Sequence, residues 1–156
     1  MKQIATKTTY LEMRSPPTRA VPVPADDVQV RSFVPTVEFY RFIYDSVGRE
    51  FNWVDRKRRS DDEMKALLEN NQYSFILLSV NSEPAGFAEL DRRSQDDIEI
   101  VYFGLRRPFI GKGLGKFFLN AVVNEAWSTS PKRVWLHTCD LDHEAALPNY
   151  RQAGFV

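Results

Sequence analysis

Cysteine is nearly absent from this 156-residue sequence, which contains only Cys139. A lone thiol cannot form a disulfide within the chain, and sequences poor in cysteine are typical of reducing compartments. Long apolar runs are absent too, because stretches such as Phe75–Leu78 are far too short to span a bilayer. Residues 1–13 lack the apolar core of a signal peptide. The sequence therefore favours a cytoplasmic protein.

An excess of either charge sign is also missing, since 21 Lys and Arg residues balance 21 Asp and Glu residues. Without a net field, neither nucleic acid nor a membrane is an expected partner. The one dense basic run, Arg56–Arg59, is expected to lie in a solvated loop. A chain of this length with 43% apolar residues can bury a core that needs no disulfide or metal. We expect one domain over residues 1–156.

Hydrophobic periodicity predicts a mixed α/β fold. Strands are predicted at Thr8–Met13, on a sheet edge, and at Tyr73–Val80, Ala85–Asp91, Ile98–Leu105 and Lys132–Thr138. Helices are predicted over Val37–Gly48, after a capping box formed by Ser60 and Glu63, over Gly113–Trp127, and from about Ala145 or Ala146 to Gly154. Residues 14–26, rich in proline, are expected to form an extended connector. This order indicates a parallel βαβ unit joined to an antiparallel meander, with helices on both faces of one mixed sheet.

The most informative segment is a glycine-rich loop, Ile110–Lys116, between a predicted strand and the longest predicted helix. Free N–H groups at a helix start carry partial positive charge, and glycines let a phosphate approach the main chain. A P-loop does not fit, because Arg106 stands five residues before Gly111. A dinucleotide fingerprint does not fit either, because Lys116 replaces its last glycine. The loop indicates a pyrophosphate site, although glycines that serve only a tight turn would give the same pattern.

Three segments resemble the GNAT superfamily of N-acetyltransferases. The family's loop signature is Gln or Arg, two residues of any type, Gly, any residue, and Gly or Ala. Ile110–Gly115 matches it except at the first position. Ile98–Leu105 is similar to the strand before that loop, and Asp142–Phe155 resembles the last helix, with His143 where many members have asparagine. The resemblance covers residues 72–156 well and residues 1–71 only by the order of elements.

The resemblance implies acetyl-coenzyme A as co-substrate, bound by the βαβ unit of a mostly antiparallel mixed sheet, and direct acetyl transfer to a primary amine of a small molecule or protein. The pantetheine arm would lie on main-chain groups near Phe103, Gly104 and Leu105. The residues expected to hold the pyrophosphate are Ile110, Gly111, Lys112, Gly113, Leu114, Gly115 and Lys116, with the two lysines as charge partners. Many relatives pair as homodimers, and the sequence leaves the oligomeric state open.

The resemblance also assigns two catalytic candidates. Tyr150 matches the family's tyrosine, so we expect it to protonate the departing thiolate as the general acid. Glu99 is the candidate general base, directly or through water. Both also fit plainer roles, as a packed aromatic ring and as a solvated carboxylate on a strand.

Four aromatic residues around the first predicted helix are expected to line the acceptor site, although ordinary helix packing explains them equally well. They are Tyr40, Tyr44, Phe51 and Trp53. Cys139 is expected to be packed rather than nucleophilic. No metal site is predicted, because His137, Cys139 and His143 have a spacing that would suit zinc only after rearrangement of the turn.

Family members usually have another strand after the glycine-phenylalanine pair. The sequence given ends at Val156, so the strand at Lys132–Thr138 is expected to lack a neighbour and to present an open edge. Two other functions stay open: an acyl-CoA-binding or regulatory domain without turnover, and a nucleotide-binding domain. Neither the acceptor nor the role of water is determined by the sequence.

Overall fold

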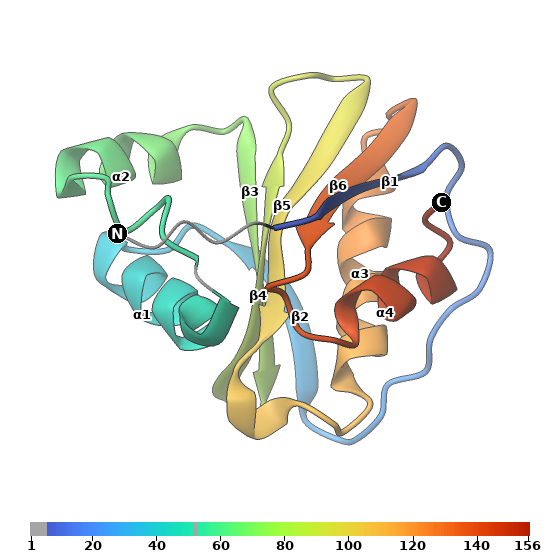
Figure 1. Ribbon diagram of the computed structural model, residues 1–156. Helices are drawn as coiled ribbons and strands as arrows, with labels where there is room; N and C mark the ends of the chain where they lie inside the picture. The colour runs from blue at the N-terminus through green and yellow to red at the C-terminus, as the bar shows by residue number, and fades with distance from the viewer. Residues whose placement is uncertain (1–5, 52) are drawn as a thin grey trace.

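The computed structural model describes residues 6–51 and 53–156, and of Glu50 only its main chain. In that part of the chain a six-stranded sheet has the order β1-β6-β5-β4-β3-β2 and separates two pairs of α-helices (Figure 1). The elements are β1 (Thr8–Met13), β2 (Val28–Phe33), α1 (Val37–Gly48), η1 (Arg49–Phe51), α2 (Asp61–Glu69), β3 (Tyr73–Val80), β4 (Glu83–Asp91), β5 (Asp97–Leu105), η2 (Arg107–Phe109), α3 (Leu114–Trp127), β6 (Arg133–Cys139) and α4 (Ala146–Ala153). The predicted mixed sheet with helices on both faces is confirmed.

Strands β2 to β5 form an antiparallel meander, and β5 pairs in parallel with β6 through the crossover helix α3. This is the predicted βαβ unit. Strand β2 was not predicted, although Val28 and Val30 alternate with polar residues, which is a strand pattern. Both valines pack against the core, so the alternation was the usable signal.

The expected open edge beside β6 is wrong. Strand β1 pairs antiparallel with the whole of β6, from Thr8 opposite Cys139 to Met13 opposite Val134. On the other side of β1, the main chains of Glu12 and Val156 exchange two hydrogen bonds, each of 2.9 Å. The segment before the connector therefore covers the edge that was expected to be free, and Thr8–Met13 is an edge strand as predicted.

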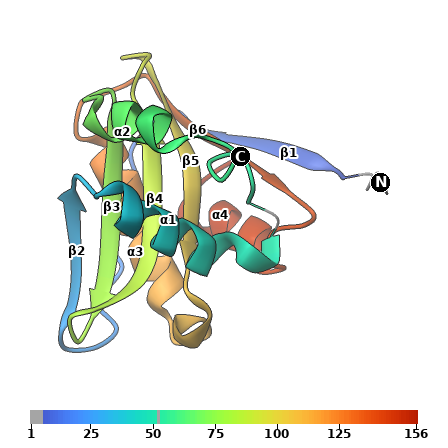
Figure 2. The same ribbon diagram turned by 90° about the vertical axis from the view of Figure 1, so that its left-hand side faces the viewer.

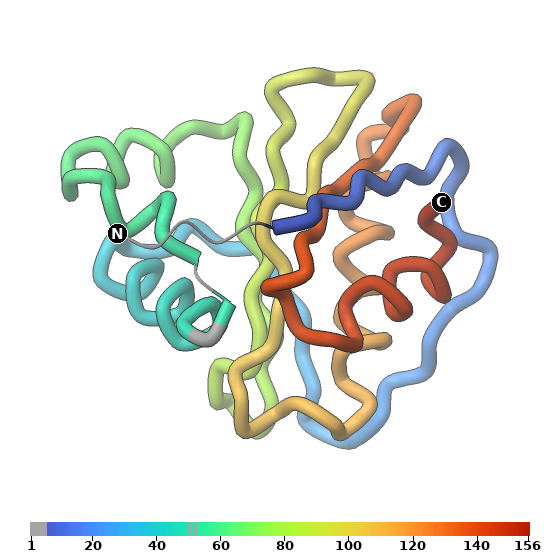
Figure 3. Tube along the Cα trace, viewed as in Figure 1, coloured from blue at the N-terminus to red at the C-terminus, as the bar shows by residue number. Residues whose placement is uncertain are grey.

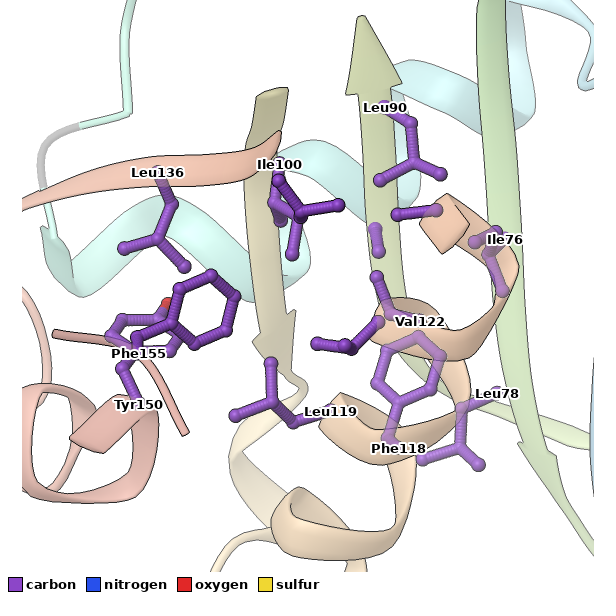
Figure 4. Close-up of a cluster of buried hydrophobic side chains, with 14 of the residues drawn as sticks. Ile76, Leu78, Leu90, Ile100, Phe118, Leu119, Val122, Leu136, Tyr150 and Phe155 are labelled. Carbon is purple, nitrogen blue, oxygen red and sulfur yellow. The ribbon is translucent and has the colours of Figure 1, made fainter. Parts of the chain in front are cut away.

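Each face of the sheet has its own apolar core. On one face α3 and α4 pack on the strands, and Figure 4 shows Phe118, Val122 and Leu119 of α3 between Ile76 and Leu78 on one side and Phe155 on the other. On the opposite face, which Figure 2 brings to the front, α1 and α2 cover β3 and β4 through a second buried cluster. The sheet is therefore buried from both sides at its centre.

Local signals begin and end the helices as expected. Helix α2 starts with a complete capping box, in which Ser60 and Glu63 bond each other's main-chain N–H groups. Helix α4 begins at Ala146, so Pro148 stands within its first turn, where a missing N–H costs little. Gly154 ends α4 in the left-handed conformation.

The predicted connector, residues 14–26, leaves β1 and runs past α3 and α4 to reach β2 at the far edge of the sheet (Figure 3). The main-chain oxygen of Arg19 accepts a hydrogen bond from the Asn120 side chain of α3, at 3.1 Å. Among the described residues, no helix combines the length and the apolar composition needed to cross a membrane.

Candidate active site

A cavity opens where the parallel strands β5 and β6 stop pairing. Their ladder runs from Asp97–Arg133 to Glu99–Trp135. Just beyond it, β5 has a bulge: Leu90 faces Ile100 and Glu89 faces Tyr102, so Val101 is the extra residue. A bulge bends its strand and strengthens the local twist. The cavity, of about 560 Å³, is lined by residues 100–105 of β5 and residues 136–139 of β6.

One end of the cavity is formed by the glycine-rich loop. Gly111 and Gly113 have φ angles of +85° and +77°, a region that other residues adopt only with strain. Gly113 is the N-cap of α3, and no described side chain caps this helix start. The N–H groups of its first turn are therefore available to an anion.

The predicted loop residues divide into those on the cavity wall and those behind it. Ile110, Gly111, Gly113, Gly115 and Lys116 line the cavity. The structure places Leu114 in the core and Lys112 outside the lining.

The predicted pantetheine-binding residues Phe103, Gly104 and Leu105 all line the middle of the cavity. Gly104 is required here by close packing, because a Cβ atom at this position would lie 2.6 Å from Cγ1 of Val47. The absent side chain lets α1 and the segment after η1 approach the strand.

Tyr150 stands on the α4 side of the cavity. Its ring packs against Phe103 and Phe155, with centroid distances of 6.2 Å in both pairs. Burial, together with the nearby charge of Asp142, raises the pKa of the Tyr150 hydroxyl above its usual range. The phenol therefore keeps its proton at neutral pH and is able to donate it.

Asp142 is a lining residue that the sequence reasoning did not single out. Its Oδ2 atom accepts hydrogen bonds from the Thr138 hydroxyl, at 2.5 Å, and from the Cys139 N–H, at 3.0 Å. This turn holds one carboxylate at the end of β6, where the chain leaves the sheet for α4. An aspartate three residues after a strand end was the available signal, since aspartate often bonds the main chain in turns.

Of the four aromatic residues predicted at the acceptor site, two line the cavity and two lie in the core. Phe51 and Trp53 line the cavity. Tyr40 and Tyr44 are each 1% exposed and lie in the core beneath it. Their rings stack with centroids 5.7 Å apart.

The expectation that Arg56–Arg59 is a solvated loop is wrong for Arg56, which is 8% exposed, while the other three residues are exposed. Its guanidinium lies 2.5 Å from the carboxylate of Glu89, a fully buried residue of β4. Burial disfavours the charged guanidinium, but the carboxylate outweighs this effect and raises the pKa of Arg56. The pair anchors the segment that carries Trp53 to the centre of the sheet.

Glu99, the predicted base, does not line the cavity. Its Oε2 atom lies 3.5 Å from Nδ1 of His137, which does line the cavity. Cys139 lines it as well and is partly buried. In the described residues, no three His, Cys, Asp or Glu side chains are grouped so that they could hold a metal ion.

Comparison with known proteins agrees with this geometry. Residues 40–155 match the Acetyltransferase (GNAT) family. The chain belongs to the GNAT acetyltransferase family, as the sequence resemblance indicated.

Solved structures share the fold at low sequence identity. A GCN5-related N-acetyltransferase from Sphaerobacter thermophilus is 18% identical with a TM-score of 0.63, over 96% of this chain and 47% of that one. An aminoglycoside acetyltransferase from an uncultured soil metagenomic sample is 15% identical, with a TM-score of 0.62 over 83% of this chain and 88% of that one. Ard1 from Thermoplasma volcanium is 19% identical, with a TM-score of 0.64 over 83% of each chain. The chain thus spans about half of the first of these and most of the other two.

Proposed function

We propose that this protein is an acyl-CoA-dependent N-acetyltransferase that moves the acetyl group of acetyl-CoA directly to a primary amine. The observation that carries the proposal is one continuous cavity, which runs from the uncapped start of α3, between the diverging strands β5 and β6, to Tyr150. Family membership supports acyl transfer as the reaction class.

The lining residues suit the successive parts of coenzyme A, from the pyrophosphate to the thioester. The N–H groups of Gly113, Gly115 and their neighbours would bind the pyrophosphate, with Lys116 as a charge partner. The main chain of Phe103–Leu105, which lies on the cavity wall, would bind the amide groups of the pantetheine arm as an added strand does. The thioester then lies beside Tyr150, and the amine enters from the side of Trp53 and Phe51.

Tyr150 supplies the proton that the leaving group needs. As the amine nitrogen bonds to the acyl carbon, the carbon–sulfur bond breaks and the sulfur takes the electron pair. The Tyr150 hydroxyl gives its proton to that sulfur, and the amine gives up one proton, so no net proton is consumed. A protonated phenol in a partly dry site suits this step.

The test is calorimetry with coenzyme A and acetyl-CoA, followed by thiol release with a panel of amines. The panel holds a diamine, an aminoglycoside and a peptide with a free N-terminus. We expect saturable binding of both coenzyme A species and thiol release with at least one amine class. Binding without release on any amine favours an acyl-CoA-binding domain without turnover. Tighter binding of ATP or NAD than of coenzyme A would reject the proposal.

A further inference from the structure

Glu99 and His137 form a pair in which only the histidine reaches the cavity. Their closest atoms, Glu99 Oε2 and His137 Nδ1, lie 3.5 Å apart. The Glu99 side chain is 18% exposed and the His137 side chain 47% exposed. His137 is a lining residue, whereas Glu99 stands behind it.

The divergence of β5 and β6 creates this arrangement. Glu99 belongs to the last pair of the parallel ladder, opposite Trp135. His137 lies two residues further along β6, on the same face as Trp135, because side chains alternate along a strand. The ladder thus fixes the carboxylate at the point where the cavity begins, and the imidazole extends over the cavity from the next position.

The surroundings of His137 are aromatic and acidic. The rings of Tyr10 on β1 and Trp135 on β6 lie 5.7 and 6.3 Å from its ring. In addition to Glu99, the charges of Asp142 after β6 and Asp55 after η1 favour the protonated imidazole. Arg56, which follows Asp55 in the chain, is paired with the buried carboxylate of Glu89.

We propose that His137 is the proton acceptor for the attacking amine and that Glu99 acts through it as a positioning residue. The inference rests on the proposed N-acetyltransferase function and replaces Glu99 as the group that meets the substrate. As the carbon–nitrogen bond forms, the nitrogen proton passes to the free ring nitrogen of His137. The exposed edge of the imidazole then releases that proton to solvent, and Tyr150 takes one proton from solvent to replace the one that left with the thiol.

The electrostatics agree with this role. Glu99, the strongest influence, raises the pKa of His137 above the usual value, against the opposing effect of partial burial. A base with a pKa near the working pH combines availability with proton affinity. The carboxylates of Glu99, Asp142 and Asp55 also attract a cationic amine to the His137 side of the cavity. The amine must then lose its charge to react.

The first experiment is a pH–rate profile of kcat/KM, with the amine found by the thiol-release panel. For the wild type we expect an acidic limb set by a group with a pKa above about 6.5, the value of an unperturbed histidine. His137→Gln should lose that limb and be about 10²-fold slower or more. Glu99→Gln should move the limb to lower pH and lower kcat, with the KM for acetyl-CoA unchanged. A His137→Gln enzyme that keeps both rate and limb would overturn the proposal.

The second measurement needs no turnover. The sequence contains two histidines, so an NMR titration of the intact protein yields two imidazole curves, and His143→Gln assigns the remaining one to His137. The His137 curve should have a pKa above about 6.5, the value of an unperturbed histidine, and this pKa should fall in Glu99→Gln. A His137 pKa that Glu99→Gln does not change would reject the pairing, even if acetyl transfer is found. Absence of thiol release with normal binding of coenzyme A would instead reject the function.

Discussion

Arg56 and Glu89 form a buried ion pair that joins the segment after η1 to the middle of β4. The Arg56 Nη2 atom lies 2.5 Å from Glu89 Oε2, and the Tyr40 hydroxyl donates a hydrogen bond of 2.6 Å to Oε1. The guanidinium also stands over the ring of Tyr102, 5.5 Å from its centroid. Both carboxylate oxygens are thus satisfied, so a charge inside the sheet is tolerated.

Removal of one partner should therefore be costly. Glu89→Gln leaves the Arg56 guanidinium buried without its counter-charge, and we expect the free energy of unfolding to fall by about 3–5 kcal/mol. The double variant Arg56→Met with Glu89→Leu should be more stable than Glu89→Gln. Urea unfolding provides the measurement. Asp96→Asn, which breaks the exposed pair with Lys132, is the control and should cost less than about 1 kcal/mol. If Glu89→Gln and Asp96→Asn lowered the free energy of unfolding equally, a structural role for the buried pair would be contradicted.

Tyr150→Phe tests the proton donor. We expect kcat to fall tenfold or more, since general acids contribute about 10²–10⁴-fold, while the affinity for coenzyme A stays the same. Steady-state kinetics and calorimetry on one preparation separate the two effects. Tyr73→Phe removes a hydroxyl from β3, outside the cavity lining, and should leave kcat unchanged. Unchanged turnover in Tyr150→Phe at saturating substrates would remove this residue from the mechanism.

Gly113→Ala tests the anion-binding start of α3. Its φ of +77° makes alanine unfavourable by about 1–2 kcal/mol, and relief of that strain would turn the first N–H groups away from the ligand. We expect the Kd for coenzyme A to rise tenfold or more, with only a small loss of thermal stability. Calorimetry measures the first and a melting curve the second. An unaltered Kd would show that the pyrophosphate lies elsewhere.

The Glu99–His137 pair predicts a pH dependence of stability. The pKa of His137 is raised in the folded state, so its contribution is complete below the unfolded pKa of about 6.5. That contribution is lost as the pH rises through the folded value. In urea unfolding at pH 5.5, 7 and 8.5, the free energy of unfolding of the wild type should fall as the pH rises. This fall should be absent in His137→Gln and present in His143→Gln. The amplitude should be small, because nearly half of the His137 side chain is exposed.

Features with a local cause were predictable from the sequence. The capping box at Ser60 and Glu63 spans one helical turn, and the left-handed glycines of the loop follow from the conformations that only glycine adopts easily. The βαβ order likewise determined that β5 and β6 run in parallel. The capping box and the glycine conformations involve residues that are near one another in the chain, and the parallel pairing follows from the order of the elements.

Features that depend on distant residues were not predictable. Arg56 stands in a basic run, which normally lies at the surface, and its partner Glu89 is reached only once β4 is placed. Glu99 was identified as a functional candidate from its strand, but its relation to His137 depends on where the parallel ladder ends. No local periodicity contains that information.

The pairing of β1 with β6 also has a kinetic consequence. These strands come from opposite ends of the sequence given, so their ladder closes a loop that contains nearly every other element. Contacts of such high sequence separation form late, because most of the chain must be ordered first. During synthesis β1 leaves the ribosome before β6 does, so it stays unpaired until β6 follows, and chaperone binding to the nascent chain is most useful during that interval.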